Sequence, residues 1–255
     1  MDDAAVCGYG MVGQATAKLF GIKKHYDIDE GRSNCKIEDL SELRYIFICL
    51  PTPIMEDHTY LVSDIRQIVS QIAALGTEKY FIIRSTVPSG FADSLASEIH
   101  SESIVSNPEF LSEATWENDT KFPPFVLIGA KSAEVREKMA GLYRSRIKHA
   151  PIIMTDNITA ETAKLALNSL FASKVVFSNQ IYDYCQKVGA NYEKVKEILT
   201  KHPYGIKNHT SVWFNEQRGV RGRCLPKDLE AFAYLTESPL LMKVKEINDE
   251  IVNQN

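Results

Sequence analysis

The segment at residues 221–228, with the sequence RGRCLPKD, places a thiol, an amine and a carboxylate close together, at Cys224, Lys227 and Asp228. The proline and the two charged residues after the thiol are typical of the first turn of a helix. A thiol just before a helix N-terminus, beside a lysine and an arginine, is expected to ionise readily to the nucleophilic thiolate. Gly222 lets another group approach the backbone closely. Alone, such a pattern is more often a buried cysteine beside a helix cap.

Polar motifs that could serve the same chemistry follow three predicted strands. Residues 45–50, 80–84 and 104–106 predict strands, and the continuous apolar run at 45–50 is typical of a parallel sheet that is covered on both faces. The motifs that follow them are PTP at 51–53, STVPSG at 85–90 and NPEFLSE at 107–113. Ligands of doubly wound sheets bind at the carboxyl ends of the strands, so these motifs predict a crevice for a cofactor and a substrate.

The N-terminal residues predict a dinucleotide site. An apolar run at 4–7 precedes GYGMVG at 8–13, and a helical pattern continues from 15 to 20. In this context the first glycine makes the tight turn, the second lets a pyrophosphate approach, and the third lets the helix pack on the strand. The helix N-terminus then presents free N–H groups to the phosphates. The residues expected to contact the cofactor here are Gly8, Gly10, Met11, Val12 and Gly13.

Asp27 ends a second short strand and predicts which dinucleotide binds. It lies about 20 residues after the first glycine, where a carboxylate accepts hydrogen bonds from the ribose hydroxyls of NAD and repels the 2′-phosphate of NADP. We therefore expect NAD as the cofactor. Arg32 could stack near the adenine or pair with a phosphate, although a solvated surface arginine fits it equally well.

From residue 158 onward the pattern is helical. Residues 158–188 contain no proline or glycine and predict one helix of roughly 45 Å. A helix of this length usually packs against a partner, which we expect to be a second copy of the chain. Glu161, Lys164 and Asn168 share one face, and a solvated face is the ordinary alternative. Shorter helices are expected at 191–200, 228–235 and 240–252, with a loop at 202–219.

The bulk properties exclude several classes of protein. The 255 residues allow one large or two smaller domains, and a net charge of -4 with scattered Lys and Arg offers no field for nucleic acid. Five cysteines without framework spacing favour a reducing compartment, with Cys7 and Cys49 in the core. The acidic N-terminus lacks a signal-peptide pattern, and the longest apolar run is too short to span a bilayer. We expect a cytoplasmic protein without a metal site, a nucleic-acid partner or a membrane segment.

These motifs together, in this order, resemble the UDP-glucose/GDP-mannose dehydrogenase family. Its pattern is a glycine fingerprint, P-T-P, S-T-V-P-x-G, N-P-E-F-L-x-E, a helix with E-x-x-K-x-x-x-N, and G-x-C-x-P-K-D. The chain shows each motif between Gly8 and Asp228, so the resemblance covers nearly all of it. The K-D ending after Cys224 and the FASK run at 171–174 look more like UDP-glucose dehydrogenases than like the N-acetylmannosamine branch.

The resemblance implies a four-electron oxidation of a nucleotide-sugar C6 alcohol to the carboxylate with two NAD reduced, UDP-glucose being the first candidate. Cys224 would attack the aldehyde and carry a thiohemiacetal and then a thioester. Lys164 and Asn168 would stabilise the oxyanion. Asp228, with Lys164 and a water, would take the hydroxyl proton, and Glu109 would be the general base for thioester hydrolysis.

The resemblance also implies contacts with the two ligands. Thr86 would orient the substrate hydroxyl or a water, and Glu113 would lie near the nicotinamide. Expected cofactor contacts beyond the glycine turn and Asp27 are Arg32, Pro51, Thr52, Thr86 and Glu113. Expected substrate contacts are Glu109, Phe110, Leu111, Lys164, Asn168, Gly222 and Lys227.

The chain departs from the family pattern in three places. Arg221 stands where the family usually has the first of two glycines before x-Cys. The substrate loop, which usually begins Arg-Ile-Gly, has KNHT at 207–210. The family normally continues into a third α/β domain that binds much of the nucleotide, and we expect this chain to lack it because only residues 229–255 follow Asp228.

We expect an α/β protein of two domains with the site between them. Residues 1–156 would form a Rossmann-like doubly wound parallel sheet that binds NAD, and residues 157–255 a mostly helical domain with one long helix and Cys224. Two alternatives to the nucleotide-sugar dehydrogenase stay open. One is a truncated, catalytically weak or inactive NAD-binding remnant of such an enzyme, which the missing domain would favour. The other is a two-electron dehydrogenase of a smaller substrate, in which Cys224 would be dispensable.

Overall fold

The protein is described by a computed structural model that covers residues 1–76 and 78–254. The chain folds into two compact units. The first unit comprises Met1–Pro53 and Tyr60–Lys164, and the second comprises Ile54–Thr59 and Leu165–Asn255. The helix α6, at Asn157–Val188, contributes its first turns to the first unit and the rest to the second.

A seven-stranded sheet organises the first unit, with the strand order β2-β1-β3-β4-β5-β6-β7. Its strands are β1 (Ala4–Cys7), β2 (Lys24–Tyr26), β3 (Tyr45–Ile48), β4 (Tyr80–Ile83), β5 (Ile104–Ser106), β6 (Val126–Ala130) and β7 (Ile152–Thr155). Neighbouring strands from β2 to β5 pair in parallel. The apolar runs predicted from the sequence form the central strands, although two of them end one or two residues earlier than expected.

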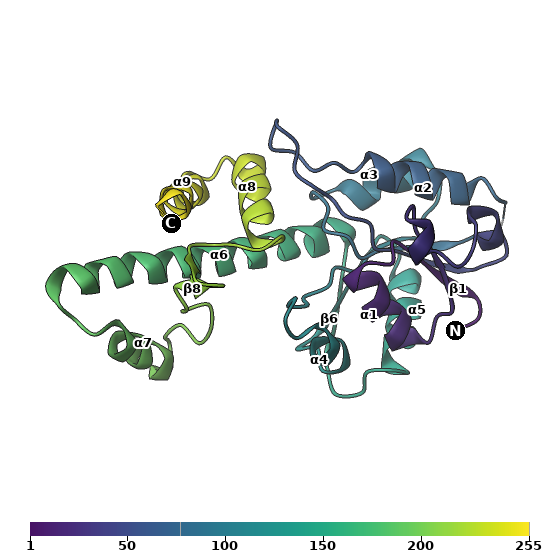
Figure 1. The fold of residues 1–255 in the computed structure, drawn as a ribbon. Helices are drawn as coiled ribbons and strands as arrows, with labels where there is room; N and C mark the ends of the chain where they lie inside the picture. Colours follow the sequence, from purple (N-terminus) through teal and green to yellow (C-terminus); the bar gives the residue numbers. More distant parts are fainter. Residues whose placement is uncertain (77, 255) are drawn as a thin grey trace. The chain divides into compact units, whose positions relative to one another are not determined.

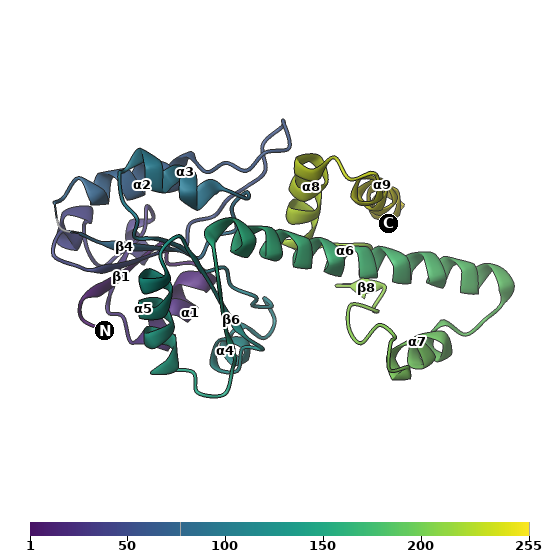
Figure 2. The same ribbon diagram turned by 180° about the vertical axis from the view of Figure 1, so that it is seen from behind.

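Helices cover both faces of this sheet (Figures 1 and 2). Alternate strand residues point to opposite faces, so Val6 and Phe47 belong to one core while Ala5 and Ile46 belong to the other. The helices α1 (Met11–Phe20) and α5 (Ala133–Arg144) pack on the first of these cores, and α2 (Ser63–Ala73) and α3 (Phe91–Glu98) on the second. Two short 3-10 helices, Glu30–Arg32 and Ile37–Leu40, precede β3.

The direction of β6 departs from the parallel sheet that the sequence predicted. It pairs antiparallel with β5 and parallel with β7. The connection between β5 and β6 carries only the short helix α4 (Trp116–Lys121), so it makes no helical crossover to the other edge. β6 therefore begins at the edge where β5 ends, and the connection keeps the NPEFLSE motif at that edge.

The second unit is built on the continuation of α6 (Figure 1). Its other helices are α7 (Tyr192–Lys201), α8 (Leu225–Thr236) and α9 (Pro239–Asn253). Both views place α8 and α9 on one side of α6 and α7 on the other. One small core joins α6 to α8 and α9 through Val176, Leu229 and Val244, and another joins Cys185 to Tyr192.

The segment between α7 and α8, predicted to be a loop, contains a two-stranded hairpin. Trp213–Phe214 (β8) pairs antiparallel with Gln217–Arg218 (β9). Asn215 and Glu216 both have positive φ, as the tight turn of such a hairpin requires. A two-residue strand is too short to show as an alternating pattern in the sequence.

Residues 54–59 leave the first unit and pack against α8 of the second. The His58 ring stacks on Tyr234 with the ring centroids 3.6 Å apart, and its Nδ1 lies 2.6 Å from Glu230 Oε1.

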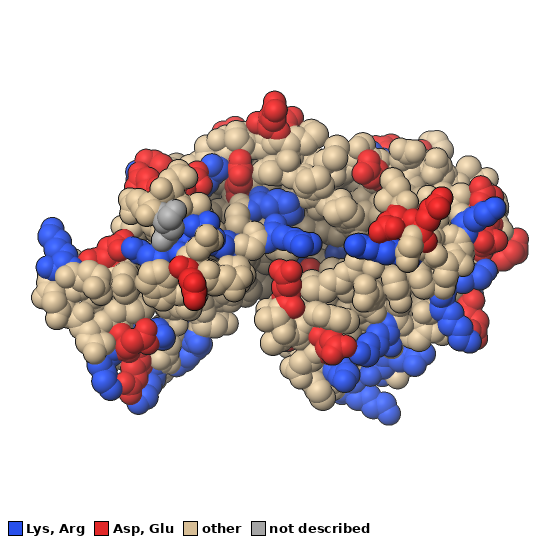
Figure 3. All heavy atoms as spheres, in the orientation of Figure 1, with Lys and Arg blue, Asp and Glu red and all other residues tan. Residues whose placement is uncertain are grey.

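Among the described residues, no helix combines the length and the apolar character that crossing a membrane requires. On the face shown in Figure 3, separate groups of basic and of acidic side chains lie among uncharged ones.

Candidate active site

The glycine turn between β1 and α1 has the geometry of a phosphate-binding loop. Gly8 has φ +90, and a Cβ on it would lie 2.6 Å from the carbonyl oxygen of Cys49. A Cβ on Gly13 would lie 2.0 Å from the carbonyl oxygen of Gly8, so the strand and the helix pack with no room for a side chain. A Cβ on Gly10 would meet nothing within 4 Å, which leaves open space at the N-terminus of α1. This space, beside a helix end without an acidic residue, fits a pyrophosphate.

Asp27 lies beside this turn, at the end of β2. Its Oδ2 accepts a 2.6 Å hydrogen bond from the Tyr9 amide, and its Oδ1 accepts one of 3.0 Å from the Asp29 amide. The carboxylate is thus fixed where the ribose of a dinucleotide would lie. Arg32 pairs with Asp29 at 3.2 Å on an exposed surface.

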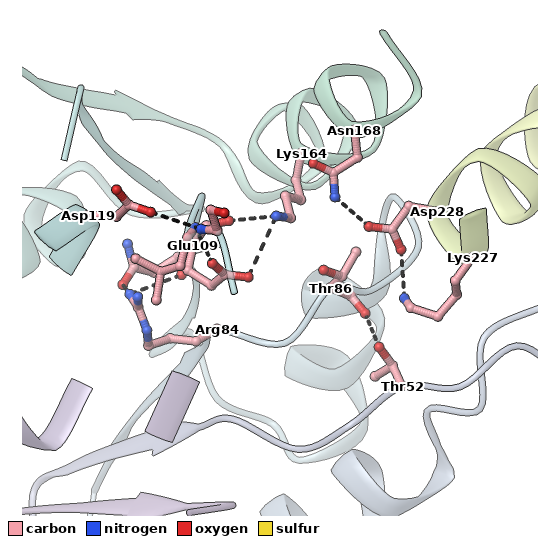
Figure 4. Close-up of polar contacts among 12 residues, drawn as sticks. Thr52, Arg84, Thr86, Glu109, Asp119, Lys164, Asn168, Lys227 and Asp228 are labelled. Carbon is pink, nitrogen blue, oxygen red and sulfur yellow. Dashed lines mark hydrogen bonds and ion pairs between the residues drawn. The ribbon is translucent and has the colours of Figure 1, made fainter. Parts of the chain in front are cut away.

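The segments after β3 and β4 are tied to each other. The Thr52 hydroxyl donates to the Thr86 carbonyl at 2.7 Å (Figure 4). The Ser85 hydroxyl donates to the Leu50 carbonyl at 2.7 Å. Thr52 is buried, whereas Pro51 is exposed. These contacts hold the PTP and STVPSG motifs side by side at the carboxyl edge of the sheet.

A buried ion pair lies at the same edge. The Lys164 ammonium donates to the Glu109 carbonyl at 2.7 Å and lies 3.7 Å from Glu109 Oε1, and the two side chains are only 6% and 10% exposed (Figure 4). The Leu111 amide donates to Glu109 Oε2 at 2.5 Å, and Lys164 stands over the Phe110 ring at 5.1 Å. These contacts bring the NPEFLSE motif and the lysine of the E-x-x-K motif together within the first unit. Glu113, by contrast, is exposed.

In the second unit, Asp228 is fully buried and held from two sides. Asn168 Nδ2 donates to its Oδ2 at 2.6 Å, and Lys227 Nζ lies 2.6 Å from its Oδ1 (Figure 4). An ionised and fully buried carboxylate is stable only with such partners. Lys164 and Asn168 are both buried, so the solvated face that charged residues on a helix usually form does not occur here.

Cys224 is the N-cap of α8, and Leu225 and Pro226 form the first turn, as the sequence predicted. It is the exposed one among the five thiols, whereas Cys7, Cys49 and Cys185 are buried. Burial raises the pKa of Cys7 strongly and that of Cys49 to about 11, which keeps these thiols protonated at neutral pH. The ready ionisation expected of Cys224 stays a prediction.

The turn before Cys224 accounts for Arg221 in place of a glycine. Arg221 Nε donates to the Arg218 carbonyl at 3.0 Å, and its Nη2 donates to the Val252 carbonyl near the end of α9 at 3.3 Å. Asn248 accepts from the Val220 amide at 2.6 Å. The arginine therefore anchors the turn to α9, while Gly222 keeps the positive φ of 84 that a glycine adopts without strain.

Two groups of buried polar residues near the site were not among the predicted site residues. Arg84 Nη1 donates to Asn107 Oδ1 at 2.7 Å and to the Tyr143 hydroxyl at 2.8 Å. Glu161, on α6, accepts hydrogen bonds from two amides and one hydroxyl of the first unit. The sequence offered one sign of the Arg84 cluster, because a charged residue directly follows an apolar strand there. The described residues hold no group of three or more His, Cys, Asp or Glu that could bind a metal.

A glycine turn after the first strand of a largely parallel sheet, with a carboxylate at the end of the second strand, defines a dinucleotide-binding Rossmann domain. Two family models match the chain. The model "UDP-glucose/GDP-mannose dehydrogenase family, NAD binding domain" matches residues 22–147, and the model of the central domain of that family matches residues 158–250. The chain belongs to the UDP-glucose/GDP-mannose dehydrogenase family, and its cofactor is NAD.

Similar proteins agree with this assignment. The UDP-glucose 6-dehydrogenase of Rickettsia felis is 29% identical over 216 residues, which cover 81% of this chain and 46% of that protein. The structure of a UDP-glucose dehydrogenase from Pyrobaculum islandicum has a TM-score of 0.85 at 22% identity, covering 98% of this chain and 68% of that one. The UDP-D-ManNAc dehydrogenase of Pyrococcus horikoshii gives 0.86 at 21% identity, covering 97% and 68%. The last two likenesses show the fold. The chain spans about half the length of the curated relatives it matches.

Proposed function

We propose that this chain catalyses the NAD-dependent four-electron oxidation of a nucleotide-sugar C6 alcohol to the carboxylate, with UDP-glucose to UDP-glucuronate as the first candidate. The observation that carries the proposal is the start of α8. Cys224 caps this helix as an exposed thiol, and one turn later Asp228 is buried and held by Asn168 and Lys227. A plain two-electron dehydrogenase has no need of a nucleophile at such a position.

NAD, which the glycine turn and Asp27 would hold, would supply the hydride acceptor for each of the two oxidations. In the first, Asp228, with Lys164 and a water, takes the proton of the C6 hydroxyl as the aldehyde forms. The Cys224 thiolate then adds to the aldehyde carbon, and Lys164 and Asn168 donate to the oxyanion of the thiohemiacetal. The second oxidation leaves a thioester on Cys224. Glu109 takes a proton from the water that cleaves it, which releases the carboxylate and restores the thiol.

The thioester gives a direct test of these roles. In a Glu109→Gln variant incubated with NAD and UDP-glucose, hydrolysis should slow and intact-mass spectrometry should detect a covalent UDP-glucuronyl adduct on Cys224. The Cys224→Ala/Glu109→Gln double variant is the matched control and should carry none. Equal labelling of both variants would contradict the thioester. Absence of any turnover or adduct in the parent chain would favour the NAD-binding remnant.

We further propose that two copies of the chain associate through α6. Leu170, Phe177 and Tyr184 recur at every seventh residue of this helix and are 50%, 46% and 62% exposed. Such spacing makes a straight apolar stripe of the kind that pairs helices. The occupant of the stripe would be the same stripe of a second copy. Five cysteines without the spacing of a disulfide framework support a reducing compartment such as the cytoplasm.

A further inference from the structure

Glu161 is the most heavily bonded buried carboxylate of the first unit. The side chain lies on α6, and the residue is 3% exposed. Its Oε2 accepts a 2.6 Å hydrogen bond from the Gly90 amide. Its Oε1 accepts hydrogen bonds of 2.9 Å from both the Ala92 amide and the Ser106 hydroxyl. One carboxylate therefore joins three segments that are far apart in the sequence.

Each of these segments leads directly to a residue of the proposed chemistry. Gly90 ends the STVPSG motif, which carries Thr86, and Ser106 ends β5, three residues before Glu109. Glu161 itself precedes Lys164 by three residues of α6, and the two line a small cavity together with Thr86 and Ser106. A second link joins the same motif to α6, because the Ser89 and Thr162 hydroxyls are 2.8 Å apart.

We propose that Glu161 is a positioning residue of the oxidation, which holds the Thr86 segment, the Glu109 segment and Lys164 in one fixed arrangement. The inference rests on the proposed function, because it assigns Glu161 a role in that reaction. A carboxylate has enough lone pairs for three donors, and α3 has no side-chain cap of its own. Glu161 thus supplies the missing cap of α3 and fixes the motif that precedes it.

The arrangement depends on the charge of Glu161. Burial raises its pKa to about 7, against the lowering effect of the three hydrogen bonds. Asp93 on α3 adds to this rise, and Lys164 on α6 is the cation that lines the same cavity. Protonation turns one oxygen of the carboxyl group from an acceptor into a donor. That oxygen then meets one of the three donor groups donor to donor, and the hydrogen bond between them is lost. Glu161→Gln makes this loss permanent at nearly the same size.

The first test is independent of catalysis. Hydrogen–deuterium exchange of the amides at residues 85–92 should rise at least roughly tenfold in Glu161→Gln, because the amides of Gly90 and Ala92 lose an acceptor. Asn157→Ala is the matched control, because Asn157 is also buried at the start of α6 and contacts Asp93 and Ser106 but not the 85–92 amides. Exchange in 85–92 should stay at the parent rate in this control. Unchanged exchange in Glu161→Gln would overturn the proposal whether or not the chain oxidises UDP-glucose.

The second test measures NADH formation with UDP-glucose between pH 6 and 8. The kcat of Glu161→Gln should fall by roughly 10- to 100-fold, the scale of a misplaced catalytic group, with the KM for NAD unchanged. The decline of kcat below about pH 7 in the parent should be absent in the variant. Ser132→Ala, which removes the N-cap of α5 away from these segments, should lower the melting temperature but keep kcat. A Glu161→Gln variant with parental kcat would overturn the positioning role. A parent without activity would contradict the proposed function, and the exchange measurement would still decide the role of Glu161.

Discussion

At the scale of residues, the proposed chemistry depends on ionisable side chains that are buried and paired. Lys164 meets Glu109 in the first unit, and Asp228 meets Lys227 and Asn168 in the second. Breaking such a pair by removing one partner costs about 3–5 kcal/mol, because the other charge stays buried. These buried pairs therefore keep their side chains in place more firmly than pairs on the surface would. The spacing of Lys164 and Asn168 predicted a shared helix face, but their burial depends on Glu109 and Asp228, which no local pattern reveals.

Lys164 and Cys224 should affect different parts of the reaction. Lys164→Ala is expected to lower the rate of NADH formation by at least roughly 10²-fold, the usual loss for one oxyanion-stabilising group. Cys224→Ala should abolish formation of the acid, which mass spectrometry of the product detects. Circular dichroism establishes that each variant is folded. Acid formation at the parental rate in Cys224→Ala would show that the thioester route does not operate.

Asp27 should set the choice between the two nicotinamide cofactors. Its fixed carboxylate faces the position of the 2′-phosphate of NADP, so calorimetry should give a clearly smaller Kd for NAD. Asp27→Ala removes the repulsion and should narrow the difference between the Kd values for NAD and NADP. Glu30, an exposed carboxylate of the same loop, offers a control position whose alanine variant should leave the difference between the two Kd values unchanged. Equal Kd values for the two cofactors in the parent would contradict the role of Asp27.

The charge state of Glu161 should also appear in the stability of the fold. Its pKa in the folded state, about 7, lies above its ordinary value, so the folded state binds the proton more tightly. The free energy of unfolding should therefore fall as pH rises from the ordinary carboxyl value to about 7, by up to about 1.4 kcal/mol per pH unit. Urea unfolding across this range should show a steeper decline in the parent than in Glu161→Gln. Parallel curves would indicate that Glu161 does not titrate there.

At the scale of elements, the β5–β6 connection and α6 are decisive. The sequence predicted the central strands and the existence of α1 and α8, because apolar runs, the glycine turn and Pro226 are local signals. The two helices begin at Met11 and Leu225, earlier than the expected residues 15 and 228. It did not predict the antiparallel direction of β6 or the β8–β9 hairpin. Strand direction depends on the path of the connection, and the hairpin depends on two residues with positive φ. Neither leaves a periodic pattern.

The apolar stripe of α6 gives a prediction about association. Phe177→Glu should convert a dimer to a monomer in light scattering at tens of micromolar protein, because it places a charge in the centre of the stripe. Ile198→Glu is the control, since Ile198 on α7 is 68% exposed and the substitution is the same. The control should stay dimeric. A parent chain of monomer mass, or dissociation of both variants alike, would count against pairing through α6.

At the scale of the whole molecule, each unit carries a part of the proposed machinery. The first unit holds the glycine turn, Asp27 and the Glu109–Lys164 pair, and the second holds Cys224 and the Asp228 cluster. Membership of the family makes NAD the cofactor. Which sugar is oxidised, and how many electrons it loses, has to be measured on the reaction itself. The number of electrons separates the three functions that the sequence left open.

The most direct measurement is therefore the amount of NADH formed per molecule of UDP-glucose consumed by the pure protein. NADH is followed by its absorbance, and the loss of UDP-glucose and the gain of UDP-glucuronate by chromatography. We expect two NADH for each UDP-glucose, with the acid as the only product that accumulates. One NADH per sugar with release of the aldehyde, or binding of NAD without any NADH formed, would contradict it.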